Sequence, residues 1–137
     1  MEMSNWKGAA GVCVNEKSEV LLVLQGAPGE EKKWTVPAGG IEGNETVEQC
    51  CAREFFDETG LSVQILEKLN TRIGEYEDSA VSFELTYFKV EVTGGEIMLQ
   101  DEDEWIADVA WKPISELGEL ELAYPDDALL IESLIVQ

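Results

Sequence analysis

The 137-residue chain is predicted to fold as an α/β sandwich, and three observations support this expectation. Segments of strand character dominate the chain, one helical segment lies near its centre, and a second lies near its C-terminal end. An apolar content of 45% with 28% charged residues is typical of a globular domain with its own core. No repeat, low-complexity tract or linker interrupts the sequence, so residues 1–137 are expected to form a single domain.

The N-terminal part of the chain is predicted to form strands separated by turns. Residues 7–15 and 19–24 are rich in small and branched apolar residues, and a Glu-Lys-Ser turn separates them. A loop that contains glycine and proline follows at 25–33. Residues 34–37 then form a short strand that leads into a glycine turn.

The central helix is expected to begin near Asn44 or Glu45 and to end near Glu58. Gly60 would stop it, because glycine readily adopts the left-handed conformation that often follows the last helical turn.

Strands are expected again at 61–76 and 80–92, with a turn at 93–95. An acidic loop at 100–104 precedes a further strand, in which alternate residues from Trp105 to Trp111 are apolar.

The C-terminal segment is predicted to be helical. A single helical turn is expected at 113–117, and a last helix is expected from Tyr124, because proline and two aspartates follow it.

Three carboxylates lie together at the end of the central helix. Glu54, Asp57 and Glu58 stand at i, i+3 and i+4 and share about 100° of arc. The apolar stripe from Val47 to Phe55 lies beside them, so Glu54 and Glu58 are expected on or near the inward face. Carboxylates this close repel one another, and a divalent cation would offset the repulsion. On the acids alone, a solvated helix end fits equally well.

The spacing of the surrounding residues favours the metal site. The fixed positions of segment 39–61 are, in order, Gly39, Glu45, Arg53, Glu54, Asp57, Glu58, Gly60 and Leu61. This spacing resembles the signature of the Nudix hydrolase family, with Asp57 where that family usually has glutamate.

The resemblance implies a fold and an activity. The implied fold is an α/β/α sandwich with a mixed β-sheet, a central motif helix and a C-terminal helix. The implied activity is Mg²⁺-dependent cleavage of a nucleoside diphosphate linked to another group, most simply (d)NTP to (d)NMP and pyrophosphate, with Mn²⁺ as a substitute ion. Alternatives within the resemblance are an ADP-ribose hydrolase, a dinucleoside polyphosphate hydrolase, and a non-catalytic domain that senses nucleotides.

The resemblance also implies roles for individual residues. The implied metal ligands are the Gly39 carbonyl, Glu54, Asp57 and Glu58. Arg53 would orient the carboxylates, with Glu45 as its partner. Glu54, Glu58, or a residue of the acidic loop such as Glu102 or Glu104, would take the proton from the attacking water. The shorter side chain of Asp57 is expected to weaken Mg²⁺ affinity without abolishing activity.

Candidate substrate contacts lie outside the motif. Lys32, Lys33 and Arg72 are the bases that could contact phosphate, although such residues are more often surface charges. Trp34, Tyr76 and Phe83 could stack on a nucleobase, although aromatic residues on strands more often serve in core or surface packing.

Composition and charge restrict the remaining classes. The net charge of −20 disfavours binding to duplex DNA or an anionic membrane. The absence of histidine excludes a Ser-His-Asp triad and a Cys-His dyad. The three cysteines are expected in the core. No secretion signal or membrane span is evident, so a cytoplasmic protein is expected, and the resemblance adds a homodimer as a further expectation.

Overall fold

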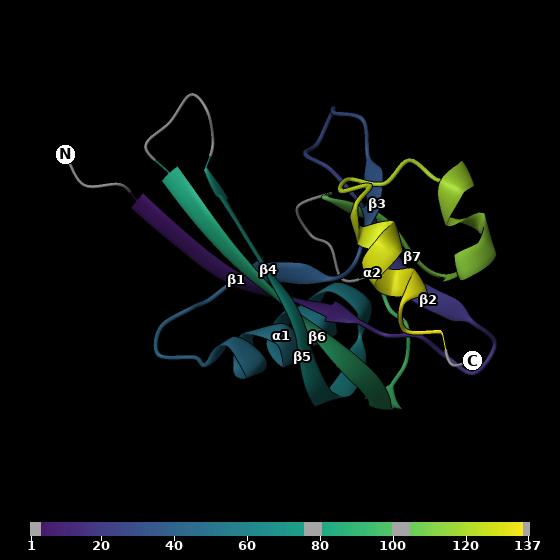
Figure 1. Ribbon diagram of the computed structural model, residues 1–137, viewed down its shortest axis with the longest axis horizontal. Helices are drawn as coiled ribbons and strands as arrows, with labels where there is room; N and C mark the ends of the chain where they lie inside the picture. The colour runs from purple at the N-terminus through teal and green to yellow at the C-terminus, as the bar shows by residue number, and fades with distance from the viewer. Residues whose placement is uncertain (1–3, 76–80, 100–104, 136–137) are drawn as a thin grey trace.

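The computed structural model describes residues 4–75, 81–99 and 105–135 (Figure 1). Its elements, in chain order, are β1 (Ser4–Val12), β2 (Glu19–Gln25), β3 (Lys33–Thr35), β4 (Ala38–Gly40), α1 (Val47–Thr59), β5 (Leu61–Glu75), β6 (Val81–Gly95), β7 (Ile106–Pro113), the 3₁₀ helix η1 (Ile114–Glu119) and α2 (Asp127–Glu132).

The strands form two sheets. The four-stranded sheet has the order β4-β1-β6-β5 and is mixed, because β1 runs parallel to β6 and antiparallel to β4. The three-stranded sheet has the order β3-β2-β7 and is antiparallel throughout. The predicted α/β class is confirmed. The mixed sheet contains four of the described strands, and β2, β3 and β7 form the separate antiparallel sheet.

Two clusters of buried side chains fill the space between the layers. Cys51 and Phe55 of α1 pack with Ala9 and Phe88 on one side of the four-stranded sheet. The second cluster joins η1 and α2 to β1, β2 and β6, and includes Ile131 of α2. Figure 1 accordingly shows α1 beside β1, β5 and β6, whereas α2 shares the second cluster with Val20 and Leu22 of β2. This arrangement of helices on both sides is the sandwich that the motif implied.

Helix α1 begins later than the sequence predicted, and its cap explains the difference. The Thr46 hydroxyl accepts a hydrogen bond from the Gln49 backbone, and the Gln49 side chain accepts one from the Thr46 backbone. This capping box places the first helical residue at Val47. Glu45 is therefore outside the helix. The predicted stop is present, because Gly60 has a φ of 83°.

Other boundaries shift by a few residues. The expected turn at 93–95 is still paired with β5, so β6 continues to Gly95. The last helix begins at Asp127, after a turn at Tyr124, rather than at Tyr124 itself. No helix of the described residues is both long enough and apolar enough to cross a bilayer.

The three cysteines are buried, as predicted. Burial raises the pKa of the Cys13 thiol to about 11 and that of Cys51 to about 12. These thiols are therefore protonated at neutral pH and act as small apolar groups in the core.

Candidate active site

Helix α1 directs two of its carboxylates toward β4. Phe55 is buried in the core, and this orients the neighbouring turn so that Glu54 and Glu58, one turn apart, lie against the strand. A Cβ at Gly39 would overlap the carboxyl group of Glu54, so only glycine fits beneath that carboxylate.

Glu58 is an unusual buried acid. Its exposure is 9%, and the hydrogen bond given to its carboxylate by protein backbone is a long one from Ala38 N, at 3.4 Å. Burial raises the pKa of Glu58 well above its ordinary value, and the adjacent Glu54 carboxyl raises it further. Two carboxyl groups in this position share a proton or require a cation between them.

Arg53 donates hydrogen bonds to Glu54 and to Glu45. Its Nε and Nη2 donate to the two oxygens of Glu45, at 2.6 and 2.8 Å, and its Nη1 donates to Glu54 at 2.8 Å. Nη2 also donates to the Gly40 carbonyl at 3.0 Å. The bonds from Arg53 lower the pKa of Glu45 to about 2. The contact expected between Arg53 and Glu45 is thus present, and it is bidentate.

Asp57 lies apart from the other two acids. Its side chain is 56% exposed, and its hydrogen bond is a long one from Arg53, at 3.4 Å. In the described ranges 4–75, 81–99 and 105–135, no three acidic or cysteine side chains are grouped closely enough to hold a metal ion. The described protein ligands for a cation are therefore fewer than the motif implied.

The donor set nevertheless fits a hard divalent ion. Glu54 and Glu58 supply adjacent carboxylate oxygens, one of them desolvated, and Mg²⁺ binds through one or two carboxylates while it keeps several waters. Gly39 pairs with Ala9 in the sheet, and its carbonyl also accepts a long hydrogen bond from the Cys50 thiol, at 3.4 Å.

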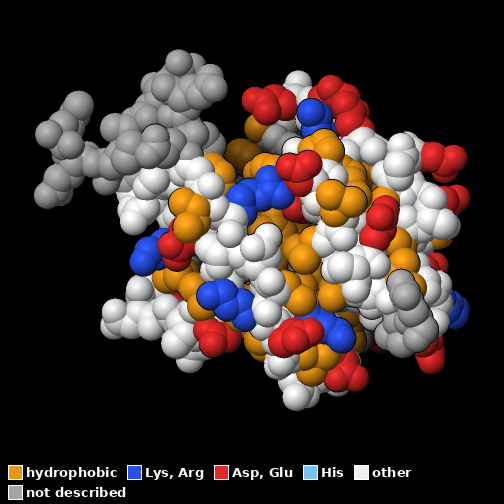
Figure 2. Space-filling model, in the orientation of Figure 1, with side chains coloured by type: hydrophobic (Ala, Val, Ile, Leu, Met, Phe, Trp, Pro, Cys, Tyr) orange, Lys and Arg blue, Asp and Glu red, His pale blue; other side chains and the backbone are white. Residues whose placement is uncertain are grey.

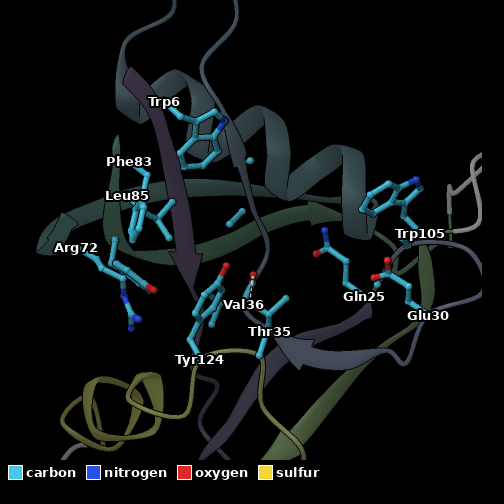
Figure 3. A pocket seen from close by; sticks show the side chains of 16 residues that line it. Trp6, Gln25, Glu30, Thr35, Val36, Arg72, Phe83, Leu85, Trp105 and Tyr124 are labelled. Carbon is cyan, nitrogen blue, oxygen red and sulfur yellow. Dashed lines mark hydrogen bonds between the residues drawn. The ribbon is translucent and has the colours of Figure 1, made fainter. Parts of the chain in front are cut away.

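A cavity of about 470 Å³ is lined in part by β4, the strand that these carboxylates contact, and neither carboxylate is itself part of its wall. Its wall includes Ala38 and Gly39, the strand residues that contact Glu58 and Glu54. Figure 3 shows aromatic side chains from distant parts of the chain around this cavity. They are Trp6, Phe83, Trp105 and Tyr124.

Arg72 is the one cationic side chain on the wall of this cavity among the described residues. It donates to Asp127 at 2.7 Å and lies over the rings of Tyr124 and Tyr87, at 5.1 and 5.9 Å from their centroids. The Tyr87 hydroxyl also donates to Asp127, at 2.9 Å. Burial raises the pKa of Asp127, although Tyr87 and Arg72 oppose the shift.

The other candidates occupy different positions. Lys32 donates to the Gly26 carbonyl at 2.8 Å, and neither Lys32 nor Lys33 is part of the cavity wall. Trp34 is covered by Lys112, whose Nζ is 4.5 Å from the ring centroid. Tyr76, Glu102 and Glu104 lie outside the described residues.

Sequence reasoning missed several residues of the wall. Trp6, Trp105 and Tyr124 are all at least 40% exposed and all line the cavity, as do Gln25 and Glu30. A tryptophan near the end of a predicted strand was the available signal, but nothing in the local sequence indicated which strands would meet there.

Few of the described acids are buried. Figure 2 shows acidic side chains spread around the face in view, among basic and apolar ones. Among the described acids, Glu58 and Asp127 are the buried ones, and Glu58 is distinguished by lying beside a second carboxyl group, that of Glu54.

The sequence profile of the NUDIX domain matches residues 5–134. The chain belongs to the Nudix family. A Mycobacterium tuberculosis protein, provisionally named mutator protein MutT4, is 39% identical over 102 residues, which are 72% of this chain and 40% of that protein. The chain thus spans well under two thirds of this relative's length.

Solved structures share the fold. A NUDIX hydrolase from Nitrosomonas europaea superposes with a TM-score of 0.81 at 22% identity, over 95% of this chain and 89% of that one. The NUDIX domain of Shewanella oneidensis NrtR, crystallised with ADP ribose, superposes with a TM-score of 0.72 at 21% identity, over 96% and 86% of the two chains. These similarities establish the Nudix fold for this chain.

Proposed function

We propose that this Nudix domain is a Mg²⁺-dependent nucleotide pyrophosphohydrolase, which most simply converts a (d)NTP to a (d)NMP and pyrophosphate. The observation that carries the proposal is the pair of adjacent carboxylates, buried Glu58 and half-buried Glu54, against Ala38 and Gly39, which line a cavity large enough for a nucleoside. A protein of net charge −20 needs a local cation to accept a polyphosphate, and this pair provides the place for one.

Glu54 and Glu58 would hold the ion, with the Gly39 carbonyl beside them and Asp57 acting through a water. Bound Mg²⁺, or Mn²⁺ in its place, supplies a more acidic water and offsets charge on the phosphoryl oxygens. The exposed position of Asp57 supports an indirect contact and the expected weaker Mg²⁺ affinity.

Arg53 would act as a positioning residue. The Nε and Nη2 atoms of its guanidinium donate to Glu45, and Nη1 donates to Glu54. These bonds would keep the Glu54 carboxylate facing Gly39. Glu54, Glu58 or Glu104 would accept the proton of the attacking water. The low exposure of Glu58 and its raised pKa suit a group whose protonation changes when a cation binds.

The substrate contacts are also proposals. Arg72 lines the cavity. Lys32, Lys33 and Tyr76 are proposed as further substrate contacts. The acidic surface supports a small anionic substrate held by metal over duplex DNA or an anionic membrane. A cytoplasmic location and a homodimer complete the proposal.

The test is a phosphate-release screen over nucleotide classes with Mg²⁺ and with Mn²⁺. Glu54→Gln and Glu58→Gln should each lower kcat by about a hundredfold or more. Glu48→Gln is the matched control, because Glu48 lies on the exposed side of the same helix. Turnover that persists in both site variants would refute the assignment.

The same screen separates the alternatives. Preferred cleavage of ADP ribose would favour the activity suggested by the ligand of the NrtR domain, and preferred cleavage of a dinucleoside polyphosphate would favour that class. Tight nucleotide binding without turnover under any ion would indicate a sensing domain.

A further inference from the structure

Arg72 is part of a partition between two cavities. It lines the cavity of about 470 Å³ beside β4, and it also lines a second cavity of about 340 Å³, whose wall comes from β5, β6 and α2. Tyr87 likewise belongs to both walls, whereas Asp127 belongs to the wall of the smaller cavity and not to that of the larger one. Asp127 therefore lies behind Arg72 as seen from the larger cavity.

The guanidinium of Arg72 is held from several sides. Its Nη2 donates to Oδ1 of Asp127 at 2.7 Å, and the Tyr87 hydroxyl donates to the same oxygen at 2.9 Å. Its central carbon lies 5.1 Å from the ring centroid of Tyr124 and 5.9 Å from that of Tyr87. These partners come from β6 and from the start of α2, so the fold places the guanidinium before a ligand binds.

Asp127 supplies a negative charge directly beside this cation. The Asp127 side chain is 7% exposed and that of Arg72 is 28% exposed, so water screens the pair less than it would at the surface. Burial raises the pKa of Asp127, and both Tyr87 and Arg72 oppose this shift by stabilising the carboxylate. The ionised carboxylate offsets much of the charge that Arg72 presents to the larger cavity.

The charge at this end of the larger cavity depends on these two residues. Among the described residues of its wall, the charged side chains are Arg72 and Glu30. Figure 3 shows them toward opposite sides of the cavity, with Tyr124 on the same side as Arg72. Binding of an anionic group near Tyr124 is therefore decided by Arg72 and by the carboxylate behind it.

We propose that Asp127 is a specificity-determining residue, which offsets the charge of Arg72 and so disfavours substrates with an extra phosphate on the part that enters the larger cavity. This inference rests on the proposed function, which places the phosphoanhydride at Glu54 and Glu58 and leaves the cavity for the rest of the substrate. Arg72 then contacts the substrate as a hydrogen-bond donor whose charge is already balanced.

The test compares ligands that differ by one phosphate. Calorimetric titrations in Mg²⁺ would measure the affinity of adenosine 5′-monophosphate and of the 2′,5′- and 3′,5′-bisphosphates of adenosine. Asp127→Asn removes the charge but keeps an oxygen that can accept both hydrogen bonds. It should improve the binding of at least one bisphosphate, relative to the monophosphate, by about tenfold.

Asp126→Asn is the matched control. Asp126 precedes Asp127 at the start of the same helix, is exposed, and makes no side-chain capping bond, so the substitution changes the net charge equally. The affinity ratio of bisphosphate to monophosphate should stay within about twofold of wild type, because an exposed charge away from Arg72 is screened. Asp127→Glu, which keeps the charge, should also stay close to the wild-type ratio.

Arg72→Gln tests the same pair without altering Asp127. It leaves the carboxylate unbalanced, so both bisphosphates should weaken relative to the monophosphate by about threefold or more. The double variant Arg72→Gln with Asp127→Asn removes both charges and should return the ratio to that of wild type. Thermal unfolding of each variant would confirm that the proteins compared are folded.

An affinity ratio in Asp127→Asn that equals the wild-type ratio would overturn the inference. An improvement that persists in the double variant would also overturn it, because the effect would then not act through Arg72. The titrations need no turnover, so they separate this inference from the proposed function. A shifted ratio in a protein that hydrolyses no nucleotide would support the role of Asp127 and refute the proposed hydrolase activity.

Discussion

Replacement of Gly39 by alanine should separate activity from stability. The added Cβ would overlap the carboxyl group of Glu54, whose side chain ends at that point. Carbon atoms in ordinary contact are about 3.5–4.0 Å apart, so the carboxylate must retreat by roughly 1 Å or more. Because Glu54 is flexible and only its far end is displaced, the backbone need not move.

The expected magnitudes follow from this local displacement. A misplacement of about 1 Å at a catalytic group lowers activity by roughly a hundredfold. The free energy of unfolding should change by no more than about 1 kcal/mol, because alanine also restricts the unfolded chain relative to glycine. The φ of Gly39 is not positive, so alanine adds no left-handed strain.

Steady-state kinetics with Mg²⁺ and urea unfolding, performed on the same preparations, would measure both quantities. Gly94→Ala is the matched control, because Gly94 is also a strand residue and a Cβ there has nothing within 4 Å. Full activity in Gly39→Ala would refute the reasoning, since the Glu54 carboxylate would then be dispensable at this position. A large loss of stability with normal activity would refute it equally.

Three further predictions concern the same helix. Asp57→Glu should bind Mg²⁺ more tightly in a calorimetric titration, because the longer side chain reaches further; unchanged or weaker binding would contradict this. Arg53→Lys should lower kcat by about tenfold or more while thermal unfolding stays near wild type, because lysine cannot make the two parallel bonds to Glu45; a wild-type kcat would show that the fork is not needed. Glu58→Gln should make the metal-free protein more stable at neutral pH. The raised pKa of Glu58 means that the folded state binds more protons than the unfolded state above pH 4.5, so the stability of wild type falls as pH rises through that window, and the variant lacks this loss. Urea unfolding in chelator from pH 4 to 8 measures the difference; parallel pH profiles for the two proteins would refute it.

The helix and its acids were predictable because their signals are local. The 3.6-residue period places Glu54 and Glu58 beside the apolar stripe, and burial of Phe55 leaves them facing β4. Gly60 ends the helix because glycine readily adopts the left-handed conformation, and this depends on that residue alone. The start of the helix was less predictable, because Thr46 and Asn44 are both good caps, and the reciprocal bonds with Gln49 decide between them.

The position of Asp57 was not predictable from spacing. It shares the helix end with Glu54 and Glu58, but one step of about 100° carries it away from β4 and toward solvent. The helix period allowed either placement until the packing of α1 against the sheet was known.

The chain by itself determined the α/β class, the motif helix and the close pair of carboxylates, since each depends on residues within one or two turns of one another. Only the tertiary structure decided that Trp6, Arg72, Phe83 and Tyr124 surround one cavity beside that pair. The parallel pairing of β1 with β6 joins residues that are more than seventy positions apart. Pairing at that distance is selected by packing of the whole core and leaves no signal in the neighbourhood of any one of these side chains.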